Sequence, residues 1–346
     1  MIVVAPSLGP GRRRGKRGEG GYARRRSPNN PMHRRVKENE SREFNGLCHF
    51  DKYRNDMISD RGAGPAGRTI NDPSRWGTTV TMHLTRPPRL RRLRRFVERL
   101  WVVRAAPGHA VELVLPSGRM QLLVNLAGGG LGDFDLSGAP LSRTGALALQ
   151  GPTIAPRMLD ARRQAAICGV SFRPGGAAFL AGAAPELTDR VVDLDHFWPG
   201  CAGRLFDRLC GEADPHRLLD RLERALAWRL GGVAPDAAFA RAAAMLGHGH
   251  RVADVQAALD LSPHRLRRLF REQTGVAPKQ FARIERFRRL VRRLPSRASW
   301  AELALELGYV DQAHMIREFR AFSGTSPARY RAVAPDMPTH YRPPAG

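Results

Sequence analysis

The chain has 346 residues, 42% of them hydrophobic, and carries a formal net charge of +25. This length allows two domains of ordinary size with real cores, which excludes a chain that is disordered throughout. The charge indicates a polyanionic partner, either nucleic acid or an anionic membrane surface. Only four of the 57 basic residues are Lys, so a general bias toward Arg contributes to the charge as well.

Residues 1–76 are rich in Arg, Gly, Pro and Asn and show no sustained hydrophobic period. A segment of this composition buries too little apolar surface to offset the entropy of ordering. We therefore predict a disordered basic extension over 1–76, with a DNA-binding arm as the functional alternative.

Cysteine usage and hydropathy limit the cellular setting. The four cysteines form neither a CxxC pair nor a zinc-ligand spacing, which is typical of free thiols in a reducing compartment. No apolar run approaches the roughly 18 residues of a membrane span. We expect a cytoplasmic, nucleoid-associated protein with no membrane partner, no metal and no cofactor.

Residues 77–240 read as a β-rich domain with helices at its end. From Arg89, apolar residues at helical spacing predict an amphipathic helix that leads into a strand: Leu90, Leu93, Phe96, Val97 and Leu100. Short β-type runs follow, namely VELVLPSG, MQLLVNL, ALALQG and AAICGVSFRPGG. Turn residues separate them, which favours a small antiparallel barrel or sandwich. Helical periodicity then returns in RLLDRLERALAWRL, Arg217 to Leu230.

Residues 241–333 contain an internal repeat at an offset of 49 residues. Apolar residues correspond in the pairs Val255 and Ala304, Ala258 and Leu307, Leu261 and Val310, Leu266 and Met315, and Phe270 and Phe319. Gly275-x-x-Pro278 likewise corresponds to Gly324-x-x-Pro327. The repeat predicts one helix-turn-helix unit present twice, and residues 334–346 are expected to form a disordered tail.

The second helix of each unit has start and stop signals. Ser262 before Pro263, and Asp311 in the second unit, are N-cap residues, while Gly275 and Gly324 suit left-handed helix ends. Helical wheels place His264, Arg267, Arg268 and Arg271 on the exposed side of one helix, and Ala313, His314, Arg317 and Arg320 on that of the other. Lys279 to Leu294 between them predicts a connecting helix of about 24 Å. Such a spacer could place the two helices about 34 Å apart, one turn of DNA.

The second unit resembles the second helix-turn-helix of AraC-type transcription regulators. The residues that carry the resemblance are Ala304, Gly308-Tyr309, Asp311-Gln312, His314, Arg317, Phe319, Gly324, Pro327 and Tyr330-Arg331. Leu261-Ser262, Leu266, Leu269-Phe270, Gly275 and Pro278 are similar to the first unit. The resemblance implies base contacts by His264, Arg267, Arg268, Ala313, His314 and Arg317. Ile316 departs from the usual Ser or Thr, and Ala313 can offer a base only a methyl contact.

The β-type block is similar to the sensor domain of one AraC-type subgroup, through Leu115 to Gly118 and Gly169 to Gly176. This resemblance implies a cupin-like module for an unknown small-molecule effector or for dimerisation. The predicted fold is thus α+β and multidomain: a β-barrel or cupin-like domain, then an all-α double helix-turn-helix domain.

The expected function is that of a bacterial transcription regulator that binds double-stranded DNA in two successive major grooves. Arg271, Lys279 and Arg320 are expected on phosphates, with RNA polymerase and a second copy of the chain as further partners. We expect no enzyme activity, and the sequence does not decide between activator and repressor. A cupin-like metalloenzyme remains an alternative, although the block and its surroundings supply only His109, His196 and His216. A non-specific DNA-coating protein is the other alternative, favoured by charge alone.

Overall fold

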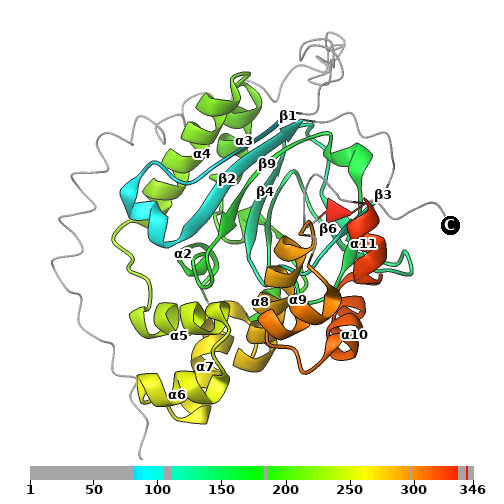
Figure 1. Ribbon diagram of the computed structural model, residues 1–346. Coiled ribbons are helices and arrows are strands. Elements are labelled where there is room, and N and C mark those ends of the chain that lie inside the picture. Colours follow the sequence, from blue (N-terminus) through cyan, green and yellow to red (C-terminus); the bar gives the residue numbers. More distant parts are fainter. Residues whose placement is uncertain (1–81, 105–110, 183–184, 297, 334–339, 342–346) are drawn as a thin grey trace, which may run out of the picture. The chain divides into compact units, whose positions relative to one another are not determined.

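The structure is a computed structural model that describes residues 82–104, 111–182, 185–296, 298–333 and 340–341 (Figure 1). All of them belong to one compact unit, Arg68–Gly346. The extension predicted over 1–76 lies outside the described residues.

The strands are β1 Met82–Arg86, β2 Val97–Arg104, β3 Val111–Val114, β4 Gln121–Asn125, β5 Gly132–Phe134, β6 Pro140–Arg143, β7 Leu147–Gln150, β8 Arg157–Asp160, β9 Ala166–Phe172, β10 Val191–Asp193 and β11 His340–Tyr341. The α-helices are α2 Ala178–Ala181, α3 Ala202–Cys210, α4 Pro215–Leu230, α5 Ala237–His248, α6 Val252–Leu259, α7 Pro263–Thr274, α8 Pro278–Arg293, α9 Trp300–Glu306, α10 Gln312–Ser323 and α11 Pro327–Val333. Short 3₁₀ helices are η3 Arg91–Arg95, η4 Ala161–Gln164, η5 Pro185–Leu187 and η6 Leu194–His196.

The strands form two antiparallel sheets with the orders β1-β2-β9-β4-β7-β10 and β11-β3-β8-β5-β6. Alternate residues of β2 serve opposite faces of the first sheet, as the two-residue period of a strand requires. Leu100 and Val102 join a core with helices α3 and α4, whereas Trp101 and Val103 pack with Leu131 on the other side. A β-rich domain followed by a helical region is the predicted fold class, and it is confirmed.

The prediction of an amphipathic helix from Arg89 is wrong, although a strand follows as predicted. Only the short η3 forms there, and strand β2 begins at Val97. The register of β2 against β9 shifts between Val97 and Arg99, as in a β-bulge. The irregularity puts Val97 and Leu100 on the same buried face although they are three residues apart, so a strand shows the spacing of a helix.

Two cores stabilise the helical region. Phe239 of α5, Leu266 and Phe270 of α7, and Phe281 of α8 form the first. Further along α8, Ile284 and Phe287 pack with Met315 and Phe319 of α10 in the second. One helix therefore serves both units, and Figure 1 shows α8 between the pair α6 and α7 and the pair α9 and α10.

The end of the chain returns to the β-rich domain. His340 pairs with Val114 and Tyr341 with Leu113, which adds β11 to the edge of the second sheet. The disordered tail predicted over 334–346 is therefore wrong for these two residues. Burial lowers the pKa of His340 below its ordinary value.

Candidate nucleic-acid interface

Helix α7 has the predicted caps. The Ser262 side chain accepts a hydrogen bond from the Arg265 N–H at 3.2 Å, Pro263 occupies the first turn, and the helix ends at Gly275 with φ +74°. Leu266 and Phe270 are fully buried. The residues expected on the outer face are all exposed: His264, Arg267, Arg268 and Arg271.

Among the residues that the structure describes, these side chains make one weak ion pair. Arg268 Nε lies 3.8 Å from Glu272 Oε1, and both side chains are more than half exposed. An exposed pair of this kind contributes little, so the guanidinium group is available to a ligand. Lys279, at the start of α8, is exposed as well.

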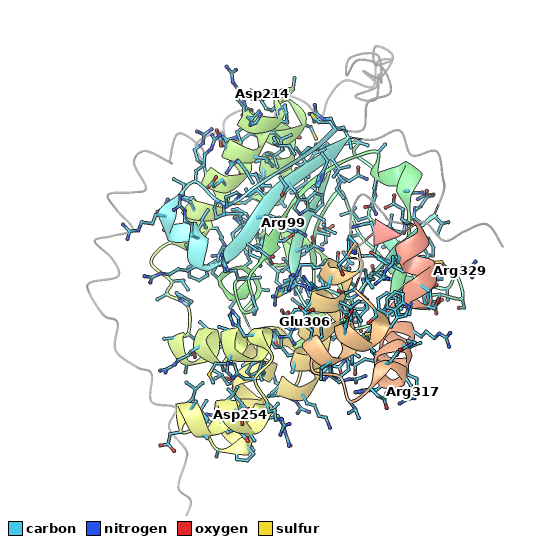
Figure 2. All side chains as sticks on the ribbon, viewed as in Figure 1. Arg99, Asp214, Asp254, Glu306, Arg317 and Arg329 are labelled. Carbon is cyan, nitrogen blue, oxygen red and sulfur yellow. The ribbon has the colours of Figure 1, made fainter. Side chains whose placement is uncertain are left out.

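Helix α10 is built in the same way. The Asp311 side chain accepts from the His314 N–H, and Gly324 ends the helix at φ +69°. Met315 and Phe319 are fully buried. Ala313, Arg317 and Arg320 are exposed, together with Gln312, which the sequence prediction had not included. Arg317 lies on the outer side of α10 (Figure 2).

His314 is half-buried, with 30% of its side chain exposed, whereas the wheel predicted an exposed residue. Its Nδ1 accepts a hydrogen bond from the Val310 N–H at 3.3 Å, and its Nε2 lies 3.5 Å from Glu318 Oε2. A ring tautomer with its proton on Nε2 satisfies both contacts. The ring edge also packs on Tyr309, with 5.6 Å between centroids. Both nitrogens are therefore engaged within the protein.

Glu318 joins helix α10 to the connecting helix α8. This residue is 6% exposed, and both of its oxygens accept from Arg286 Nη2 at 3.0 Å. Arg283 Nε donates to the same carboxylate at 3.3 Å. Arg286 also donates to the Gly308 carbonyl and lies 4.5 Å from the centre of the Tyr309 ring. Burial, together with the Glu318 charge, raises the pKa of Tyr309 well above its ordinary value.

The two units differ in the turn between their helices. The first helices are capped by Arg251 and Ser299, 48 residues apart, whereas the second are capped by Ser262 and Asp311, 49 residues apart. Hydrogen bonds give the same shorter offset at the start of the turn, from the Leu261 N–H to Gln256 and from the Tyr309 N–H to Ala304. The second turn thus contains one additional residue. The constant offset of 49 predicted from the sequence is wrong for the first helices.

A loop of the β-rich domain packs on α8. Leu113 and Leu115 belong to the core that contains Ile284 and Phe287. A Cβ atom at Gly118, where φ is +60°, would lie 3.1 Å from Ile284 Cγ2. The Leu115-Pro116-Ser117-Gly118 motif therefore forms a close contact with the connecting helix, which its turn residues alone had not indicated.

A cluster of four charged side chains completes this contact. Arg119 Nη2 lies 3.0 Å from Glu285 Oε1 of α8, and Arg119 Nε lies 3.6 Å from Glu98 Oε2 of β2. Arg288 pairs with Glu285 at 3.0 Å and with Glu98 at 3.7 Å. Burial lowers the pKa of Arg119 to about 10, so the guanidinium stays charged near neutral pH. Although burial alone would raise the pKa of Glu98, Arg288 and Arg119 hold it below its ordinary value.

Other features of the described part of the chain bear on a membrane partner and on a metalloenzyme. No helix there is long and apolar enough to span a membrane. Within the same residues, no three His, Cys, Asp or Glu side chains gather as metal ligands. His196 and His216 are exposed, and His109 lies outside the described residues.

Two family models match separate parts of the chain. Residues 255–332 match the family described as "Helix-turn-helix domain", and residues 85–193 match "Domain of unknown function (DUF6597)". No curated protein matches the chain.

Three solved structures are similar to parts of the chain. The C-terminal domain of AraT, a response regulator from Geobacillus stearothermophilus, is 21% identical over 28% of this chain and 85% of that one, with a TM-score of 0.27. An apo variant of ToxT from Vibrio cholerae is 11% identical over 67% of this chain and 97% of its own, with a TM-score of 0.39. Wild-type ToxT bound to an unsaturated fatty acid is 11% identical, covers 74% and 96%, and has a TM-score of 0.38.

The repeated, capped helices of residues 255–332 and their family match identify the C-terminal part of the chain as an AraC-type DNA-binding helix-turn-helix domain, which follows a β-rich domain of a family without assigned function.

Proposed function

We propose that the chain is a sequence-specific transcription regulator whose helices α7 and α10 enter two successive major grooves. The supporting observation is that each of these helices is capped, buries its apolar side and exposes Arg, and that one 16-residue helix, α8, packs into both of their cores. A helix of that length spans about 24 Å. Neighbouring major grooves on one face of DNA are about 34 Å apart, a distance that α8 and the flanking helices can cover together.

The exposed side chains suit this role. Arg267 and Arg268 of α7 and Arg317 of α10 can donate bidentately to guanine, and His264 can make a single hydrogen bond to a base edge. Ala313 offers a methyl contact. Arg271, Lys279 and Arg320 lie in or beside these helices and would contact phosphates, which makes affinity depend on salt.

Selection of bound DNA from a random pool, followed by footprinting of the full chain, tests the proposal. We expect a preferred site with two protected segments about 10 base pairs apart, centre to centre. A protein that only coats DNA would select no sequence and would lose affinity with salt equally on all DNA. Absence of a preferred site would refute sequence-specific reading.

Arg268→Ala is expected to cost about 1–3 kcal/mol of binding free energy at the preferred site and to relax preference at one or two base pairs. Arg317→Ala should have the same two effects, with the preference relaxed at base pairs about one DNA turn away. Arg320→Ala serves as the matched control, because a phosphate contact weakens all sequences similarly and reduces the salt slope by about one. Titrations at several salt concentrations measure both quantities. Unchanged selectivity in both Arg268→Ala and Arg317→Ala would place these helices along the backbone instead.

We also propose that the β-rich domain modulates DNA binding through its contact with α8. The loop from Leu115 to Arg119 packs on the helix that connects the two reading units, and it leads directly into strand β4. A small molecule that shifted this strand would act on α8 and thereby on the spacing of α7 and α10.

A further inference from the structure

The additional residue of the second turn is Val310. In the first unit the left-handed residue Asp260 is followed by half-buried Leu261 and then by the cap Ser262. In the second unit the left-handed residue Gly308 is followed by buried Tyr309, then Val310, then the cap Asp311. Tyr309 therefore takes the place of Leu261. Val310 therefore has no counterpart in the first unit.

The turn holds Val310 in a fixed outward position. Its side chain is 87% exposed, although it is a large apolar residue. Its backbone N–H donates to His314 Nδ1, and the His314 ring is itself held by Tyr309 and Glu318. The next residue, Asp311, is fixed by capping α10. The side chain is thus presented to solvent by a restrained backbone at the start of the reading helix.

Val310 lies directly before Asp311, the N-cap of α10, where the backbone is still extended. Val310 is exposed, as are Ala313 and Arg317 on the helix itself. Two of the exposed residues at this end of α10, Val310 and Ala313, are therefore apolar, whereas Arg317 further along is cationic. In the first unit, by contrast, the residue before the cap is half-buried and the exposed start of α7 carries His264 and Arg265. The two reading helices therefore present different chemistry.

We propose that Val310, together with Ala313, is a specificity-determining residue that selects a thymine 5-methyl group in the groove entered by α10. The inference rests on the proposed function. In the major groove the 5-methyl group of thymine is the apolar group on a base edge, and apolar side chains contact it. The Arg residues on the same helix favour DNA over an apolar protein surface as the occupant. The half-site under α10 therefore contains thymine, whereas α7 favours guanine through its arginines.

Replacement of thymine by deoxyuridine tests the inference with the full chain and its selected DNA site. Deoxyuridine lacks only the 5-methyl group, so each thymine under α10 is exchanged in turn. We expect one or two positions at which the exchange weakens binding about fourfold, the factor given by one buried methyl-sized group. In Val310→Ala this penalty should disappear. At the same position, DNA that carries 5-methylcytosine should bind the unsubstituted chain more tightly than DNA that carries cytosine.

Leu305→Ala is the matched control, because Leu305 of α9 is also a strongly exposed apolar side chain of the second unit, at 83%. It should retain the deoxyuridine penalty. Val310→Thr, which keeps the shape and one methyl group, checks that the Val310→Ala result does not come from an altered turn, and it should retain part of the penalty.

The outcomes separate the inference from the function on which it rests. A selected half-site without thymine, or a penalty that persists unchanged in Val310→Ala, overturns the inference and leaves sequence-specific binding intact. Loss of regulation in Val310→Ala with unchanged DNA affinity and penalty overturns it in favour of a protein partner. The absence of any selected site overturns both.

Discussion

Glu318→Gln is expected to lower the free energy of unfolding of the second unit by about 3 kcal/mol, as measured by chemical denaturation. The substitution keeps the shape of the side chain but leaves Arg283 and Arg286 facing an uncharged group. Removing one partner of a buried ion pair costs about 3–5 kcal/mol. We expect the lower end, because the two arginine side chains are 39% and 22% exposed and water screens them in part.

Glu272→Gln is the matched control, since Glu272 pairs with Arg268 at the surface of α7. It should change stability by no more than about 0.5 kcal/mol. Leu269 of the first unit corresponds to Glu318, so Glu318→Leu combined with Arg286→Met replaces the ion pair by apolar packing. That double variant should recover most of the loss. A loss in Glu318→Gln no larger than in Glu272→Gln would show that the carboxylate does not hold α10 to α8.

Helices α7 and α10 could be predicted from the sequence because the residues that determine their ends and their buried sides are local. Ser262, Asp311, Gly275 and Gly324 cap α7 and α10 at the predicted positions. The apolar residues that recur within each helix are the ones that are buried, such as Leu266 and Phe319. Signals that lie within a few residues of one another do not depend on the rest of the fold.

Predictions failed where a local pattern had two structural meanings. Val97 and Leu100 are three residues apart, which suits a helix and also suits a strand with a bulge; pairing with β9 decided for the strand. The offset of 49 aligned Leu261 of the first turn with Val310 of the second, because both are apolar. In the structure it is Tyr309 that is buried in the second turn. The left-handed Gly308 marks the earlier end of α9, a signal that could have located the additional residue.

His314 was assigned to the exposed face because a helical wheel gives the position of a residue but not the direction in which its ring turns, here toward the Val310 N–H and Glu318.

Contacts between distant segments were beyond sequence reasoning. Arg119 and Glu285 are far apart in the chain, and neither has a local signature of its partner. Their pairing follows from the docking of a β-domain loop on α8, which only the folded structure shows.

Glu285→Gln is expected to cost about 3–5 kcal/mol of unfolding free energy, because Arg119 and Arg288 would remain at this contact without the carboxylate that lies 3.0 Å from each. Glu306→Gln is the matched control: its pair with Arg293 is as short, 2.8 Å, but both side chains are about half exposed. We expect a change of at most about 1 kcal/mol there. Denaturation of both variants measures the difference.

The pair joins the β-rich domain to the connecting helix, so its loss should also be visible locally. Amide hydrogen exchange should accelerate in both β4 and α8 of Glu285→Gln, whereas Glu306→Gln should leave β4 unchanged. A double-mutant cycle that combines Glu285→Gln with Arg119→Met should give a coupling energy of about 0.5–3 kcal/mol between Glu285 and Arg119. If Glu285→Gln behaved like Glu306→Gln, the contact would be incidental and modulation through α8 would lose its support. If only α8 responded, Glu285 would serve the helix-turn-helix domain alone, because a residue that transmits a change between the domains must stabilise both sides of the contact.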